Sequence, residues 1–174
     1  MRLRYLHLQN YPPISDIKVC FASGSPMNRE CAIRFVVGVN GSGKSNLLRA
    51  VAEVFLAMAD LRVPAFPVSL IYELGARGSQ SHRTLLLHCP GTRQLASLWL
   101  HERFAFDDHS GPEVFEACTE HLALHGKPMD LGFTALIEPG HWPQRDSTPP
   151  QIALPSAVLA YTTGDLRPWR SVWN

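Results

Sequence analysis

The sequence has almost no excess of charge of either sign, because 16 basic and 15 acidic side chains give a net charge of +1 over 174 residues. A chain with this balance has no overall attraction to nucleic acid or to an anionic membrane surface. A local basic face is compatible with the count but is not predicted by it. Nucleic-acid binding is therefore unsupported by the charge, and functions that need a strongly basic protein are disfavoured.

Long hydrophobic runs and a secretory leader are also missing. No apolar run approaches the roughly 18 residues that a membrane-spanning helix needs, and residues 1–8 alternate polar and apolar side chains, unlike a signal peptide. The cysteines form no C-x-x-C pair, since they stand at Cys20, Cys31, Cys89 and Cys118. Reduced thiols in a cytoplasmic protein without membrane contact are the simplest interpretation.

In place of these features, the chain has one eight-residue motif, Gly38-Val39-Asn40-Gly41-Ser42-Gly43-Lys44-Ser45. It has the G-x-x-x-x-G-K-S spacing of the phosphate-binding loop called Walker A. Its glycines let the backbone adopt positive φ angles and approach a phosphate without a Cβ atom in the way. Successive N–H groups can then form a concave nest for an anion. The motif therefore predicts a site for the phosphates of a nucleotide.

Two side chains at the end of this motif have specific predicted roles. Lys44 should reach the β- and γ-phosphates as a point charge, so it is the predicted catalytic residue. The Ser45 hydroxyl should be a ligand of Mg²⁺, because Mg²⁺ takes oxygen ligands from the protein and the phosphates together. A helix that begins near Lys44 would add its positive N-terminal end to the same site.

The flanking sequence has the strand–loop–helix order that this motif requires. Residues 32–37 form a short, mostly apolar run that is typical of a buried parallel strand. After the loop, a helix is predicted over residues 44–61, closed by Pro64, because apolar side chains recur at helical spacing at Leu47, Leu48, Val51, Val54, Phe55 and Met58. The alternative is a glycine-rich turn between a strand and a helix that binds nothing.

The other segments predict mainly antiparallel strands. The alternation of side chains favours a first pair of strands at residues 1–8 and 16–21, with a turn at 10–13 between them. Further predictions are a meander of strands at 67–74, 83–89 and 95–103, a helix at 113–125, a proline-rich surface loop or mobile linker at 139–150, and a last strand at 152–161.

The first 60 residues or so resemble a known family. The run Leu6-His7-Leu8-Gln9-Asn10-Tyr11 comes first, then a strand ending in Phe21, then the loop with Asn40 and Asn46. This order resembles the N-terminus of an ABC-type ATPase of the SMC/RecF-like branch of AAA-family proteins. Asn40 and Asn46 favour this branch over small GTPases and nucleotide kinases. More loosely, the chain resembles the ATPases of bacterial restriction and anti-phage systems.

The resemblance implies an α/β fold class: a P-loop NTPase partial core with an antiparallel β subdomain. ATP and Mg²⁺ are the implied cofactors, and the nucleotide-binding residues are Gly38, Asn40, Gly41, Ser42, Gly43, Lys44, Ser45 and Asn46. The implied parts of a single, incomplete domain are residues 1–63, 64–138, 139–151 and 152–174. In the intact family two ATPase cores clamp two ATP molecules, so a second core, as in a homodimer, is the implied partner.

Hydrolysis by this class needs a Walker B strand that ends in acidic residues, and the sequence contains no such Asp-Glu pair after an apolar run. Glu73 and Glu138 follow apolar runs, but each is better explained as a plain strand end. Thr162-Thr163-Gly164-Asp165 is interpreted as a turn rather than an ABC signature. We therefore expect a fragment that binds ATP weakly and hydrolyses it slowly or not at all.

Three other groups of residues are weighed against simpler explanations. Cys118, His121 and His125 share one face of the predicted helix, yet an ordinary polar face is favoured over a zinc site. Residues 107–109 are expected to form a solvated loop rather than a metal cluster. Tyr11 could stack on adenine, but a turn aromatic that packs on the sheet is the commoner outcome.

Two other function classes remain open beside the ATPase. In the first, the chain is a non-catalytic interaction module that uses nucleotide as a structural ligand, which the absent Walker B motif favours. In the second, it is a small nucleotide kinase. That class needs an arginine-rich lid over the phosphates, and the sequence shows none.

Overall fold

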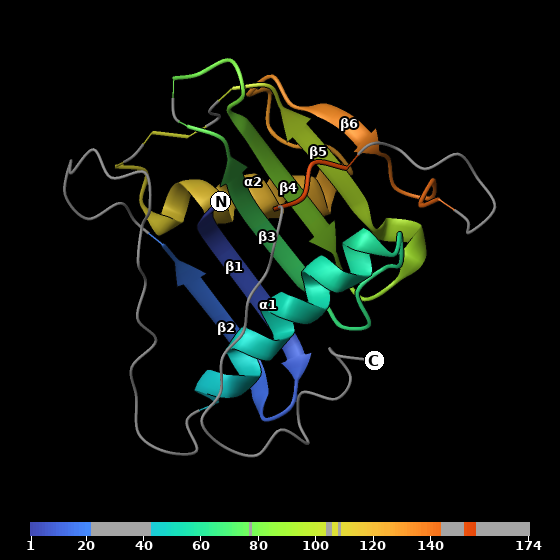
Figure 1. Ribbon diagram of the computed structural model, residues 1–174. Helices are drawn as coiled ribbons and strands as arrows, with labels where there is room; N and C mark the ends of the chain where they lie inside the picture. The colour runs from blue at the N-terminus through green and yellow to red at the C-terminus, as the bar shows by residue number, and fades with distance from the viewer. Residues whose placement is uncertain (22–42, 77, 104–105, 108, 144–151, 156–174) are drawn as a thin grey trace.

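The computed structural model describes residues 1–21, 43–76, 78–103, 106–107, 109–143 and 152–155. Within them the chain forms one six-stranded sheet, and all of its pairings are antiparallel (Figure 1). The strand order is β2-β1-β3-β4-β5-β6. The strands are β1 (Arg2–Tyr11), β2 (Ile14–Cys20), β3 (Val68–Leu74), β4 (Arg83–Cys89), β5 (Ser97–His101) and β6 (Thr134–Ile137).

The predicted N-terminal strand pair and the predicted meander are confirmed, but they are parts of the same sheet. β1 pairs with β2 on one side and with β3 on the other, so Leu6 lies opposite both Val19 and Leu70. β1 also runs through Tyr11, into the predicted turn, which is reduced to Pro12 and Pro13. β5 is shorter than predicted, because a short 3₁₀ turn, η1 (Arg93–Leu95), precedes it.

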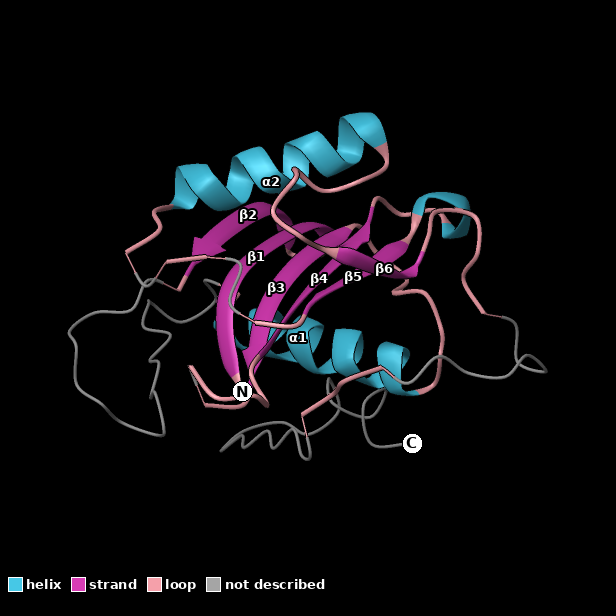
Figure 2. Cartoon of the chain, turned by 90° about the horizontal axis from the view of Figure 1, so that it is seen from above, coloured by secondary structure: helices cyan, strands magenta, loops and turns pink. Residues whose placement is uncertain are grey.

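Two helices cover opposite faces of this sheet, α1 (Lys44–Ala59) on one face and α2 (Pro112–His125) on the other (Figure 2). Both confirm the predicted helices, with small shifts at the ends. Leu48 was expected on the apolar face of α1, and Leu124 was a candidate for that of α2, but their side chains are 48% and 80% exposed. Neither helix among the described residues is long and apolar enough to cross a bilayer.

The two apolar layers follow from the alternation of side chains along each strand. Even-numbered positions of β1 and β3, such as Leu8 and Leu70, and odd-numbered positions of β4, such as Leu87, pack with α1 residues such as Val54 and Met58. Neighbouring positions on the other face, such as Ile71, pack with α2. The sheet is therefore buried on both faces along its centre.

The segment at 139–150, predicted to be a surface loop or a mobile linker, is described as far as Pro143, and this part is anchored to the rest of the fold. Trp142 is 4% exposed, and its indole Nε1–H donates to the carbonyl oxygen of Leu61 at 2.8 Å. Arg93 donates to the carbonyl oxygen of Pro143 at 2.7 Å. Residues 139–143 are thus held near the C-terminal end of α1, because the Trp142 ring packs in the apolar core. Residues 144–150, the predicted strand at 31–37 and most of that at 152–161 lie outside the described residues.

Candidate functional site

The described part of the predicted phosphate-binding loop is its junction with α1. Gly43 has a φ of 85° and a ψ of 5°, a left-handed conformation that favours glycine. The helix begins at the next residue, Lys44, and its first hydrogen bond runs from the N–H of Leu47 to the carbonyl oxygen of Gly43 at 2.9 Å. A glycine in this conformation allows the chain to turn sharply from the loop into the helix.

The first turn of α1 carries no negative charge and no side-chain cap. Neither an acidic residue nor a capping side-chain hydrogen bond is present there. The N–H groups of a first helical turn have no partner inside the helix, and together with the helix dipole they attract an anion. This end of α1 is therefore electrostatically suited to a phosphate group.

The predicted ligand side chains fall into two groups. Lys44 and Asn46 are half-buried and Ser45 is exposed, all on the first turn of α1. Gly38, Asn40, Gly41 and Ser42 lie outside the described residues, as does Thr162-Thr163-Gly164-Asp165. The structure thus places the lysine and the predicted Mg²⁺ ligand side by side in sequence at the start of α1, and the rest of the loop stays a prediction.

The β1–β2 turn lies against this junction. A Cβ atom added to Gly43 would stand 3.4 Å from Cγ1 of Ile14, the first residue of β2. Such a distance is ordinary close contact, so Ile14 packs directly on the backbone of the last loop glycine. The position of the loop end is thereby coupled to the edge of the sheet.

Tyr11 connects the same turn to the second turn of α1. Its hydroxyl accepts a hydrogen bond from Nε of Arg49 at 2.5 Å, and the guanidinium lies 5.2 Å from the centre of its ring. The ring also packs edge-on against Phe66, with ring centres 4.7 Å apart, and is 6% exposed. Burial raises the pKa of Tyr11, although the Arg49 hydrogen bond opposes this. Tyr11 therefore packs in the core, the commoner outcome, and is not available to stack on adenine.

The two acids considered for Walker B lie away from this junction. Glu73 lies opposite Arg2, at one end of β1, whereas Tyr11 and α1 meet at the other. A strand of 10 residues spans about 30 Å. Glu73 is also 3% exposed and contacts Nη1 of the fully buried Arg4 at 3.0 Å. Glu138 follows β6, the strand farthest from β1 on its side of the sheet, and is exposed.

The remaining predicted groups have mainly structural surroundings. Cys118 lies on the buried face of α2, and burial raises the pKa of its thiol to about 11. The rings of His121 and His125 lie 4.4 Å apart on the surface of α2. Across the described residues, no group of three or more His, Cys, Asp or Glu side chains is arranged to hold a metal ion. Asp107 accepts from the backbone N–H of His109 at 2.9 Å, as in a local turn.

Sequence reasoning missed a cluster of charged side chains at the opposite end of the sheet. Arg4, Glu73 and His82 are all at least 97% buried there, and His82 lies 3.8 Å from Glu73. The register shift between Leu3 and Tyr5 explains the miss, because a β-bulge breaks the alternation that locates a strand's buried face. The available signal was that Arg4 and Glu73 each stand between two apolar neighbours within a predicted strand.

Comparison with known proteins gives one match. A protein-family model described as an AAA domain matches residues 1–67, which include β1, β2, the loop motif and α1. No curated protein and no solved structure matches the chain. The AAA match favours nucleotide binding or ATPase function in general. Residues 1–67 are thus similar to the N-terminal region of an AAA-family ATPase.

Proposed function

We propose that this chain binds Mg²⁺·ATP through residues 38–46. The observation that carries the proposal is the uncapped first turn of α1, which begins directly after a left-handed glycine at the end of a G-x-x-x-x-G-K-S motif. The AAA-domain match over residues 1–67 supports it independently.

In this proposal the backbone of the loop and of the first turn of α1 supplies most of the phosphate contacts. Their N–H groups donate to the phosphate oxygens, and the helix dipole favours the negative charge. Lys44 contacts the β- and γ-phosphates, and the Ser45 hydroxyl holds Mg²⁺. Bound Mg²⁺ would neutralise charge on the phosphate oxygens. Asn40 and Asn46 complete the site, as in the SMC/RecF-like ATPases that the chain resembles.

The packing around α1 supports a preformed site. Ile14 contacts the backbone of Gly43, and the Tyr11–Arg49 hydrogen bond fixes the second turn of the helix. A site held in place before the ligand arrives loses less conformational entropy on binding. The β1–β2 turn is therefore a positioning element for the nucleotide.

We further propose that the chain alone hydrolyses ATP slowly. Glu73 is paired with Arg4 at the opposite end of the sheet, and Glu138 follows β6, the far strand. Neither carboxylate can hold Mg²⁺ or orient a water at the start of α1. In an intact ATPase of this branch, a Walker B acid would complete the catalytic site, together with the signature motif of a second core.

Titration of a fluorescent ATP analogue with Mg²⁺ tests the binding proposal. Lys44→Ala should weaken binding at least about tenfold, because a charge-assisted contact to phosphate is lost. Lys127→Ala is the matched control, since it removes an exposed lysine far along the chain, after α2. Equal affinities of the Lys44→Ala variant and the unaltered protein would refute the proposal.

A second candidate function is an interaction module in which ATP is a structural ligand only. The sequestered Glu73 favours it, because this carboxylate stabilises the fold and cannot serve catalysis. Phosphate release under multiple turnover distinguishes the two functions. Turnover at rates typical of ATPases by the chain alone would exclude the structural role and would also contradict the slow hydrolysis proposed above.

A further inference from the structure

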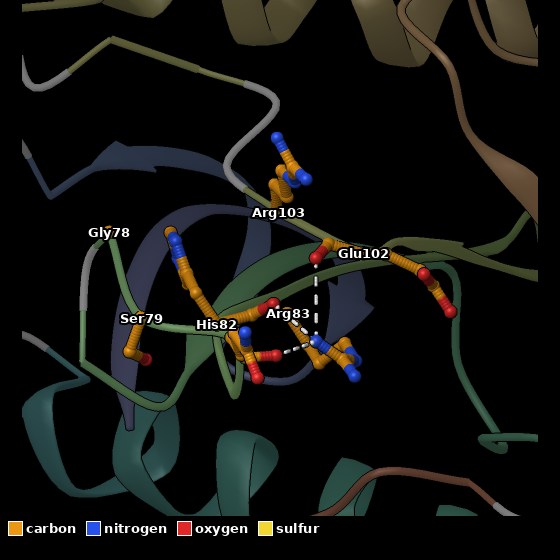
Figure 3. Close-up of a pocket in the computed structure, with 7 residues that line it drawn as sticks. Gly78, Ser79, His82, Arg83, Glu102 and Arg103 are labelled. Carbon is orange, nitrogen blue, oxygen red and sulfur yellow. Dashed lines mark hydrogen bonds between the residues drawn. The ribbon is translucent and has the colours of Figure 1, made fainter.

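A hollow lies at the end of the sheet opposite the start of α1. It has a volume of about 510 Å³ and lies between the β3–β4 connection and the residues that follow β5 (Figure 3). Its charged lining consists of Arg83, Arg103, Glu102 and the buried His82. None of these residues belongs to the proposed ATP site.

One nitrogen of Arg83 joins the two chain segments that form this hollow. Its Nη1 donates to the carbonyl oxygens of Gln80 at 2.8 Å, His82 at 2.9 Å and Glu102 at 3.3 Å. These bonds join the β3–β4 connection to the chain after β5 and fix the guanidinium. Nε and Nη2 of Arg83 make no hydrogen bond to the described residues. The edge of a guanidinium formed by Nε and Nη2 is a two-donor fork that fits two oxygens of one anion.

Arg103 supplies a second cation beside the same hollow. Its backbone is fixed, because its N–H donates to Nδ1 of His101 at 3.0 Å and its carbonyl oxygen accepts from Thr84 at 2.9 Å. Its guanidinium is in no ion pair with the described part of the chain. Figure 3 shows Arg83 and Arg103 on two sides of the Glu102 main chain.

We propose that this hollow binds a phosphate group, carried by a small phosphorylated molecule or by a nucleic-acid backbone. The fixed fork of Arg83 takes two phosphate oxygens, and Arg103 neutralises the remaining charge. Glu102 lines the same hollow, and its carboxylate repels the anion. Removal of the Arg103 charge should therefore weaken phosphate binding, whereas removal of the Glu102 charge should strengthen it. Misfolding of the variants could not produce these opposite changes in affinity.

The test follows the arginine Nε–H signals by NMR in the full chain that carries Lys44→Ala, so that the proposed ATP site does not contribute. The probes are inorganic pyrophosphate without Mg²⁺ and a short oligo-deoxythymidine. Saturable shifts of the Arg83 and Arg103 signals are expected. Arg103→Gln should weaken binding about tenfold, since a charge-assisted contact is lost. Glu102→Gln should strengthen it severalfold, because only the main chain of Glu102 is used structurally.

Arg62→Gln is the matched control, because Arg62 is 62% exposed and pairs with Asp60 away from the hollow. Tighter binding of the oligonucleotide than of pyrophosphate assigns the phosphate to a nucleic-acid backbone, and the reverse order assigns it to a small molecule. The proposal is overturned if neither probe shifts the Arg83 signal. It is equally overturned if Arg103→Gln binds like Arg62→Gln, or if Glu102→Gln does not strengthen binding in a protein that melts like its parent.

Discussion

The hydroxyl of Tyr11, at the end of β1, accepts a 2.5 Å hydrogen bond from Nε of Arg49 on α1. The same guanidinium lies over the tyrosine ring and 3.4 Å from Glu53, one turn further along the helix. The contact joins the sheet to the helix that begins the proposed phosphate site. Its energy is therefore a measure of how firmly that helix is held.

Tyr11→Phe should lower the free energy of unfolding by about 1 kcal/mol, because a largely buried hydrogen bond is lost while the ring remains. Urea unfolding of Tyr11→Phe, Arg49→Met and the double variant measures the pair. A coupling of about 0.5–1 kcal/mol is expected for residues in direct contact. Strictly additive effects would show that the hydrogen bond does not connect β1 to α1.

Gly43→Ala should abolish ATP binding at a modest cost in stability. An alanine at a φ of 85° costs about 1–2 kcal/mol, and its Cβ would only reach ordinary contact with Ile14. Gly126→Ala is the matched control, since Gly126 has a φ of 68° at the end of α2 and a Cβ there meets nothing within 4 Å. Thermal melting and nucleotide titration of both variants separate strain from binding. Similar loss of ATP affinity in both would contradict a local role for Gly43.

Glu73→Gln should be among the most destabilising single substitutions in the sheet. It removes the carboxylate that faces Arg4, and both side chains are at least 97% buried. Removal of one partner of a buried ion pair costs about 3–5 kcal/mol, because the other charge stays in a low-dielectric layer. Chemical unfolding gives the value.

The control for this prediction is Glu102→Gln, the same change at an exposed position, which should alter stability by less than about 0.5 kcal/mol. A double variant, Glu73→Leu with Arg4→Met, should recover much of the lost stability. Equal, small effects of both glutamate substitutions would mean that the Arg4–Glu73 pair contributes little.

His88 should make the protein less stable as the pH falls below neutrality. Burial lowers the pKa of this imidazole, with a smaller contribution from the charge of His7, and Ser69 lies 2.9 Å from its Nδ1. The unfolded chain therefore binds the proton more readily than the folded protein. Stability contributed by neutral His88 is complete above the unfolded pKa of about 6.5, and it decreases as the pH falls towards the lower folded pKa.

Urea midpoints at pH 7.5 and pH 5.5, conditions on either side of about 6.5, measure this effect. His88→Gln should reduce the difference between the two midpoints. His109→Gln is the control, because His109 is exposed and only its backbone N–H, which donates to Asp107, makes a described contact. This substitution should leave the difference between the midpoints unchanged. A pH dependence that is the same in all three proteins would assign the proton uptake to other groups.

Local patterns predicted the elements of this fold better than their arrangement. The alternation of Ile17 and Val19 predicted β2, and the helical spacing after Lys44 predicted α1, because both depend on neighbours in sequence. The pairing of β1 with β3 joins residues at least 60 positions apart, and no local period encodes it. The buried Arg4 was missed for a related reason. A bulge breaks the alternation there, so the side chains of Arg4 and Tyr5, although adjacent in sequence, both contact Phe115.

The candidate site shows the same division. The motif predicted that a helix begins near Lys44, and the structure confirms that beginning. The motif could not predict that Tyr11 hydrogen-bonds to Arg49 and packs against Phe66, because these contacts depend on how α1 lies across the sheet. Trp142 was likewise invisible to periodicity, as a single aromatic in a proline-rich stretch has no repeating partner.

The position of β1 between β2 and β3 limits which part of the chain can be produced on its own. The stretch that resembles an AAA domain stops at residue 67, one position before β3 supplies the second neighbour of β1. A peptide of that stretch alone would lack β3, so the backbone N–H and C=O groups of β1 that pair with β3 would lose their partners, and such an edge is one on which chains aggregate. The stretch that matches an AAA domain is thus expected to need the strands that follow it in order to stay soluble.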